Sequence, residues 1–222
     1  MTRFIFPLLL GLIGTAILLG LGTWQLQRLA WKEAILTDME ERLSAPAITI
    51  PKKVNRKRHR YQSVTVTGRL TGPELHVLTS TKTDGPGYRV IRALNAGKRR
   101  YLVDLGFVPE AAKDDLRPEV VTSLTGNIHW PDETDSFTPE PNEARNIWFA
   151  RNVATMSAEL DTDPFMIVAR HATPDQGITP WPVTVKITND HLEYAITWFS
   201  LAAVWTLMTL FWLWRINRAG RR

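Results

Sequence analysis

Hydrophobic residues are concentrated in two segments of this chain. Residues 4–27 and 194–214 contain no charged side chain, whereas the stretch between them is mixed, polar and rich in turn-forming residues. A helix needs about 20 apolar residues to cross roughly 30 Å of hydrocarbon, and each uncharged segment meets that length. The pattern predicts a short N-terminus (1–3), a transmembrane helix (4–24), a central domain (25–190), a second transmembrane helix (191–214) and a basic tail (215–222).

The first apolar segment has two interpretations, because a charged start before an apolar run is also typical of a cleaved secretory signal. Only Arg3 precedes the run, and the residues at 20–22 form a poor cleavage site. Trp24 and Trp31 flank its end, where the interfacial aromatic residues of a membrane helix lie. We therefore expect a retained anchor.

Charges around the second segment predict the orientation. Asp190 and Glu193 precede or open it, and four arginines follow it: Arg215, Arg218, Arg221 and Arg222. Positive residues favour the cytoplasmic side, so we expect both termini in the cytoplasm and the central domain on the other side of the membrane. Arg28 and Lys32, just beyond the first segment, oppose this orientation weakly.

The central domain is predicted to be rich in β-structure. A helical period continues from the first segment to a stop at 44–46, and short alternating runs separated by glycine and proline then indicate an antiparallel meander or barrel. One short helix is expected at 153–160, and the lack of other helical segments argues against a parallel doubly wound sheet. The predicted fold class is therefore a mostly antiparallel β domain flanked by two transmembrane helices. The expected strands are 64–67, 75–78, 88–94, 100–108, 120–130, 148–152 and 165–170.

Composition and charge narrow the chemistry. The 222 residues are 44% hydrophobic and include no cysteine, which excludes disulfides and thiolate chemistry. A net charge of +5 outside the membrane favours anionic lipid headgroups or an acidic protein, and not nucleic acid, as partners. The basic run 52–60 is either a solvated loop or a docking patch for such a partner.

Motifs of enzyme chemistry are missing from the sequence. It contains no nucleophile elbow, zinc-binding helix or glycine-rich phosphate loop, so we expect that the protein is not an enzyme. Acidic groups such as 132–135 are expected to be solvated loops and not calcium sites. The five methionines form no cluster that would indicate a copper chaperone. Four histidines show no metal-binding spacing: His59, His76, His129 and His171.

His191 differs from these, because it lies at the mouth of the second apolar segment, where an ionisable group is costly. An imidazole above a groove of small residues with aromatic walls would suit haem, whose iron takes an axial nitrogen ligand. A histidine that caps the helix at headgroup level is the alternative, and the spacing leaves both interpretations open. Helical spacing places these residues below or beside His191: Tyr194, Ala195, Trp198, Phe199, Ala202 and Trp205.

Four segments resemble motifs of the surfeit locus protein 1 family, the Shy-type factors of cytochrome c oxidase assembly, and they occur in the same order. Residues 189–199 (NDHLEYAITWF) are similar to the signature that enters the family's second membrane helix. Residues 22–25 (GTWQ), with Arg28, Trp31 and Lys32, resemble the exit of the family's first helix. Residues 85–90 (GPGYRV) resemble its central turn, and residues 146–151 (NIWFAR) resemble its late strand.

Two positions depart from the family pattern. Leu105 precedes Gly106 and Phe107 where the family usually has an arginine, and Asn152 stands where an aspartate is common. We expect these departures to change only the surface chemistry of the outer domain and to leave the function of His191 intact.

The resemblance implies a bacterial inner-membrane protein with a periplasmic domain, because no targeting presequence precedes the first helix. Such a protein would help to deliver or stabilise haem a while the catalytic subunit of the oxidase matures. His191 would be the axial ligand of the haem iron, with Tyr194 and Trp198 beside the ring. The implied partners are the catalytic subunit, haem a synthase and membrane lipid. The alternative is a scaffold that stabilises an assembly intermediate without binding haem.

Overall fold

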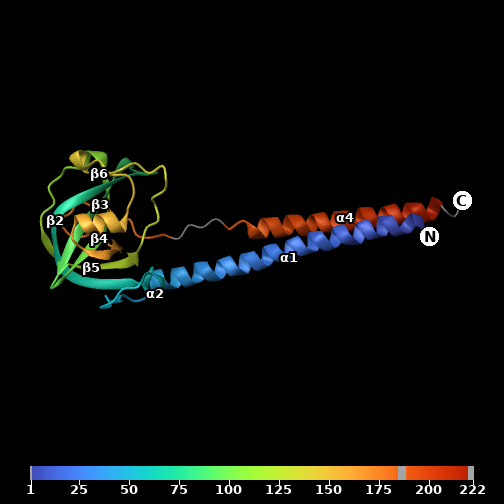
Figure 1. The fold of residues 1–222 in the computed structure, drawn as a ribbon, viewed down its shortest axis with the longest axis horizontal. Coiled ribbons are helices and arrows are strands. Elements are labelled where there is room, and N and C mark those ends of the chain that lie inside the picture. The colour runs from blue at the N-terminus through green and yellow to red at the C-terminus, as the bar shows by residue number, and fades with distance from the viewer. Residues whose placement is uncertain (1, 185–188, 220–222) are drawn as a thin grey trace. The chain divides into compact units, whose positions relative to one another are not determined.

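The computed structural model describes residues 2–184 and 189–219 (Figure 1). Arg221 and Arg222, two of the arginines that predict the orientation, lie outside the described residues. The chain divides into two compact units. One unit contains the two long helices (Met1–Asp38 with Lys186–Arg222), and the other is a β domain (Met39–Val185).

Both apolar segments form single helices, α1 (Thr2–Ser44) and α4 (His191–Ala219), and each is long and apolar enough to cross a membrane. α1 ends where Ser44 Oγ donates a hydrogen bond to the Glu40 carbonyl (2.8 Å). Pro46, which has no N–H to continue a helix, follows two residues later. The two predicted terminal helices, and the extension of the first as far as 44–46, are confirmed.

α1 and α4 lie side by side and run in opposite directions (Figure 1). A glycine in α1 permits close approach, because a Cβ on Gly22 would lie only 2.7 Å from Phe199 Cε1. Further along the pair, the hydroxyl oxygens of Thr15 and Thr206 are 3.0 Å apart. Small residues and interhelical hydrogen bonds are common means of helix association in membranes, so this pair is built as a membrane hairpin would be.

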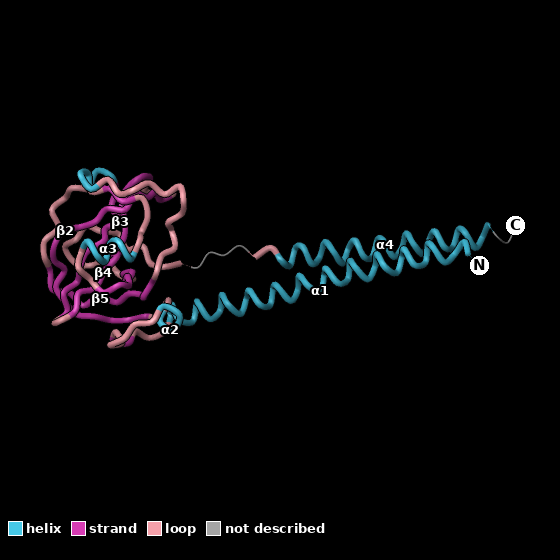
Figure 2. The backbone as a smooth tube through the Cα atoms, viewed as in Figure 1, coloured by secondary structure: helices cyan, strands magenta, loops and turns pink. Residues whose placement is uncertain are grey.

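The β domain closes into a barrel (Figure 2, strands in magenta). In the described part of the chain the sheet order is β1-β2-β3-β4-β7-β5, and β5 also pairs with β2. Of the five pairings around this ring, four are antiparallel and β4–β7 is parallel. The strands are β1 (Ile48–Thr49), β2 (Ser63–Thr81), β3 (Gly85–Ala96), β4 (Arg99–Pro109), β5 (Val120–His129), β6 (Ile147–Trp148) and β7 (Asp163–Ala169).

Short helices connect these strands, and the predicted helix at 153–160 is present as α3. The prediction of a mostly antiparallel, barrel-like domain with a short helix is therefore confirmed. A single helical turn in the basic run, α2, was not expected. The short helical elements are α2 (Arg56–His59), η1 (Glu110–Ala112), η2 (Glu143–Arg145) and α3 (Val153–Glu159).

The strands expected at 64–67 and 75–78 are parts of one strand, β2. Its pairing with β3 shifts register between Thr71 and Leu75, where Gly72 has a φ of 75°. A bulge of this kind bends a strand, and here the first half of β2 pairs with β5 while the second half pairs mainly with β3. The glycine and proline at 72–73 therefore mark a corner of the barrel and not a turn between two strands.

The strand expected at 148–152 is shorter than predicted. Only Ile147 and Trp148 form β6, which pairs with β2 in parallel. The chain then leaves the sheet to enter α3, whose N-cap is Asn152. The side chain of Asn152 accepts hydrogen bonds from the backbone N–H groups of Ala154 and Thr155. Asparagine and aspartate cap helices about equally well, so this departure from the family pattern preserves the local structure.

Apolar side chains cover both faces of the barrel wall. Along β3, Val90 belongs to a core cluster inside the barrel, and Ile91 belongs to a second cluster that includes Met156 of α3. Alternation of side chains across a strand explains this division. Leu105 is 1% exposed and lies in the inner cluster. The expectation that this departure changes surface chemistry is therefore wrong, since Leu105 is part of the hydrophobic core.

Candidate functional site

His191 and Gln25 bring together motifs from opposite ends of the sequence. His191 is the first residue of α4 and is half-buried, and Gln25, in α1, is 9% exposed. The Nδ1 atom of His191 lies 2.8 Å from Oε1 of Gln25. Because an amide oxygen can only accept a hydrogen bond, this contact requires the imidazole proton on Nδ1, and in that tautomer of the neutral ring the lone pair is on Nε2. An imidazole in this tautomer can bind a metal ion through Nε2.

The small-residue face below His191 is packed against α1. Ala195 and Ala202 are 1% and 3% exposed, and the nearby ring of Phe199 lies against Gly22. Close contact between the helices explains why small residues recur on this face. The groove that the spacing suggested at Ala195 and Ala202 is therefore filled, and a flat ring has no access to this face.

Aromatic surface remains on the outside of the helix pair. Tyr194 is 55% exposed and Trp198 is half-buried, and they follow His191 by about one and two helical turns. A ring bound to Nε2 could lie against these side chains with its other face open. His191 would hold the iron of a haem here, and Tyr194 and Trp198 would contact the ring from one side without forming a closed pocket.

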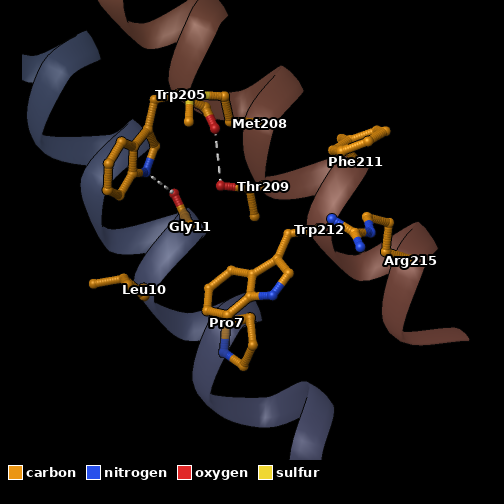
Figure 3. A pocket seen from close by; sticks show the side chains of 9 residues that line it. All are labelled: Pro7, Leu10, Gly11, Trp205, Met208, Thr209, Phe211, Trp212 and Arg215. Atoms are coloured by element: carbon orange, nitrogen blue, oxygen red, sulfur yellow. Dashed lines mark hydrogen bonds between the residues drawn. The ribbon is translucent and has the colours of Figure 1, made fainter. Parts of the chain in front are cut away.

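A second apolar feature lies at the other end of the helix pair (Figure 3). It is a groove of about 420 Å³ in which Trp205 Nε1 donates a hydrogen bond to the Gly11 carbonyl (3.2 Å). Its lining contains no histidine, cysteine or tyrosine, and the thioether of Met208 is its one side chain of a kind that binds haem iron, so it is a poorer candidate than the site at His191. The lining residues are Pro7, Leu10, Gly11, Trp205, Met208, Thr209, Phe211, Trp212 and Arg215.

The barrel contains a buried ionic cluster centred on Asp104, whose side chain is fully buried. Arg89 Nε and Arg151 Nη1 each lie 2.8 Å from Asp104 Oδ2, and the Gly106 N–H donates to Oδ1 at 3.1 Å. Arg89 and Arg151 belong to the segments 85–90 and 146–151. Two of the four motif segments therefore meet at one carboxylate in β4.

Further contacts hold the two arginines in place. Arg89 Nη2 donates to the Trp181 carbonyl (2.6 Å), and its guanidinium lies 4.6 Å from the centre of the Trp181 ring. Arg151 forms a forked ion pair with Glu133. Burial alone would raise the pKa of Glu133, but hydrogen bonds from Arg151 outweigh it and hold the pKa below its ordinary value. Paired, hydrogen-bonded charges in a buried position of this kind are suited to a structural role.

A second buried cluster surrounds Glu74. Arg117 Nη1 and His76 Nε2 lie 2.9 and 3.1 Å from Glu74 Oε2, and Asn146 Nδ2 donates to the Glu74 carbonyl (2.7 Å). Burial tends to raise the pKa of Glu74, but the hydrogen bond to His76 and the charge of Arg117 hold it below its ordinary value. His76 and Asn146 therefore have structural partners, which agrees with the expectation that His76 is an ordinary polar residue.

The remaining candidates from the sequence form no metal centre. Within residues 2–184 and 189–219, no group of three or more histidine, aspartate or glutamate side chains is placed to hold a metal ion. His59 Nδ1 accepts a hydrogen bond from the Asn55 N–H (2.8 Å), and His171 is exposed. The basic run 52–60 places exposed cations on and before α2, which is compatible with either interpretation of this run: Lys52, Lys53, Arg56, Lys57 and Arg58.

We predict that His129 makes the stability of the β domain depend on pH. Burial lowers the pKa of His129 to about 4, and its Nδ1 has no hydrogen-bond partner among the described residues. In the unfolded chain this histidine has a pKa near 6.5 and binds a proton more readily. The free energy of unfolding therefore has its full value above about pH 6.5 and falls by up to roughly 3 kcal/mol as the pH drops to 4. His129→Phe preserves a ring to stack on Tyr61 and should flatten this dependence.

Chemical denaturation of the full-length protein and the His129→Phe variant between pH 7 and 4.5 provides the measurement. Parallel curves of unfolding free energy against pH for the two proteins would contradict the role of His129.

This chain is similar to a known protein family and to named relatives along most of its length. A model of the SURF1 family matches residues 12–203, a range that includes both Gln25 and His191. A SURF1-like protein of Monosiga brevicollis is 30% identical over 225 residues, covering 91% of this chain and 85% of the relative. A SURF1-like protein of Rickettsia felis is 28% identical over 224 residues, covering 93% and 95%. Surfeit locus protein 1 of Rattus norvegicus is 29% identical over 215 residues, covering 83% and 68%.

The family match covers the β domain and extends into both terminal helices. The match and these relatives also agree with the resemblance of the four motif segments, which the structure places at the His191–Gln25 pair and around Asp104 and Glu74. The chain belongs to the SURF1 family.

Proposed function

We propose that this protein is a non-enzymatic assembly factor of haem–copper cytochrome c oxidase that binds haem a through His191 and passes it to the catalytic subunit. The observation that carries this proposal is the hydrogen bond from Nδ1 of His191 to Gln25, which leaves Nε2 with a lone pair on a half-buried imidazole. Membership of the SURF1 family supports the connection to oxidase assembly. In the buried cluster around Glu74, the carboxylate that lies beside His76 is also paired with Arg117, and no serine or threonine nucleophile is hydrogen-bonded to His76 among the described residues, which supports a non-enzymatic role.

The site has the features that a carrier needs. Haem a, when bound, would supply the redox-active iron of the oxidase. His191 provides one axial nitrogen, and Tyr194 and Trp198 provide an aromatic wall on the outside of the helix pair. Because these residues enclose only one side, the opposite side of the ring would be accessible to a receiving protein. An open site favours transfer over permanent storage.

The proposed location is a bacterial inner membrane, with α1 and α4 spanning the lipid and the β domain in the periplasm. Arg215 and Arg218 in the last turns of α4 support a cytoplasmic C-terminus. The proposed partners are the catalytic subunit of the oxidase and haem a synthase, with membrane lipid around the helices.

We predict that a reporter active only in the cytoplasm will be active when fused after Arg222 and silent when inserted near Asp135. Two membrane crossings place these positions on opposite sides of the membrane. Reporter activity in intact cells, normalised to the amount of fusion protein, is the measurement. The reverse pattern would contradict the proposed orientation.

A scaffold that stabilises an assembly intermediate without haem is the second candidate function. It is favoured by the filled face at Ala195 and Ala202, and by large apolar side chains that the β domain exposes. Phe137 is 89% exposed and Leu116 is 100% exposed, which suits contact with another protein.

Purification of the full-length protein from cells that make haem a distinguishes the two functions. The carrier should contain a Soret band in a near-stoichiometric ratio to protein. A colourless protein, purified from membranes in which haem a is present, would contradict haem binding and favour the scaffold.

A further inference from the structure

Gln25 is a buried amide within the uncharged segment of α1. It is 9% exposed, and among the described residues its side chain is hydrogen-bonded to His191. Polar side chains are costly in membrane helices unless they are paired, so an amide in this position needs a partner. The interaction joins two helices through residues that are 166 positions apart in sequence.

This hydrogen bond controls two properties of the imidazole. The amide oxygen can accept only from a protonated Nδ1, so it favours the tautomer with the proton on Nδ1 and the lone pair on Nε2. The bond also limits rotation of the ring, because Nδ1 must stay toward α1 and Nε2 therefore points away from Gln25. Metal-binding histidines commonly use their second nitrogen in this way, which fixes the ring and increases the basicity of the ligating atom.

We propose that Gln25 is the positioning residue of His191: it selects the tautomer that can bind haem iron and orients Nε2 toward the outside of the helix pair. Gln25 acts through His191 and does not itself contact the ligand. This inference rests on the proposed function of His191 in haem binding. It also gives α1 a role in the site, because His191 on α4 binds haem iron in this way only when Gln25 on α1 accepts its hydrogen bond.

A purely structural role is the competing explanation, because any interhelical hydrogen bond also holds two helices together. The chain offers a matched control in Thr15, whose hydroxyl lies 3.0 Å from that of Thr206 in the same helix pair. Thr15→Val removes an interhelical hydrogen bond without touching His191. Gln27→Leu is a second control, because Gln27 is an exposed amide two residues from Gln25.

The first measurement uses the full-length protein without haem. Histidine rings are labelled with ¹⁵N, and the signals of His191 are identified by their loss in His191→Ala. We expect the Nδ1–H tautomer in the wild type, in Thr15→Val and in Gln27→Leu. Gln25→Leu should lose this preference, and Gln25→Glu, which keeps an acceptor oxygen, should retain it. A His191 tautomer that is the same in Gln25→Leu and the wild type would overturn the inference.

The second measurement is haem a binding by the same proteins, followed through the Soret band. Loss of a hydrogen-bonding partner to a metal ligand typically weakens affinity by about 10–100-fold, and we expect a loss of this size in Gln25→Leu. Gln25→Glu should restore binding and lower the reduction potential of the iron, because a carboxylate makes the imidazole a stronger donor. Thr15→Val and Gln27→Leu should bind as the wild type does.

Failure of this inference is distinguishable from failure of the proposed function. A wild type that binds no haem a would overturn the proposed function, and the positioning role with it. A wild type that binds haem a, together with a Gln25→Leu variant of equal affinity and unchanged tautomer, would overturn only the role of Gln25.

Discussion

Replacing His191 with alanine is expected to remove most of the haem a that copurifies with the protein. The substitution deletes the nitrogen that is proposed to bind the haem iron. Loss of a residue that hydrogen-bonds a metal ligand typically weakens metal affinity by roughly 10–100-fold. Loss of the ligand itself should weaken haem a binding by at least as much. The ratio of Soret absorbance to protein, measured on equal amounts of purified wild type and variant, gives the result.

Folding must be followed in the same experiment, because His191 has a buried partner. From its position at the helix mouth alone, removal of His191 would have little effect on folding. The hydrogen bond to Gln25 changes this expectation, since an unpaired buried amide costs about 1–3 kcal/mol. His171→Ala, at an exposed histidine, is the matched control and should keep the full pigment. Equal pigment in His191→Ala and wild type would remove His191 from the mechanism.

Asp104→Asn is expected to destabilise the β domain severely. The substitution keeps the shape of the side chain but removes its charge, and so leaves Arg89 and Arg151 with a neutral partner in the fully buried position. Breaking a buried ion pair typically costs roughly 3–5 kcal/mol, a large part of the stability of an ordinary domain. Arg151 keeps its ion pair with Glu133, so most of the destabilisation should come from Arg89, which loses its charged partner.

Chemical denaturation of the full-length variants, followed by circular dichroism in the strand region, measures this loss. Asp161→Asn is the control, because Asp161 forms an exposed pair with Arg100 at 3.2 Å and its side chain is 92% exposed. This variant should differ from the wild type by less than about 0.5 kcal/mol. A similarly small effect of Asp104→Asn would show that the cluster does not hold the barrel together.

The helices and most strands could be predicted from the sequence because their signals are local. The uncharged segments at 4–27 and 194–214 are sufficient to predict α1 and α4, and turn residues locate β3 and β4 closely. Prediction failed where the extent of a strand depends on its pairing with segments far away in the sequence. The glycine and proline at 72–73 predict a turn between two strands, but β2 continues through them because each half of β2 has a different partner strand.

The chemistry of the candidate site was only half predictable. His191 is conspicuous as an ionisable residue at the mouth of an apolar segment, but Gln25 is one amide in a motif and shows no role until α1 lies beside α4. The small residues at Ala195 and Ala202 suit either a ligand groove or a helix contact, and only the packing shows the contact. The ionic cluster at Asp104 depends on segments far apart in sequence, which no periodicity reveals.

Transfer of haem a is the most direct test of the central claim. Haem-loaded wild-type protein would be mixed with oxidase catalytic subunit purified from cells that cannot make haem a, and the two would be separated by an affinity tag. We expect the pigment lost by the wild-type protein to appear in the catalytic subunit, at a rate faster than from haem a released into detergent. Pigment that stays with the protein, or that reaches the subunit no faster than free haem a does, would contradict the account.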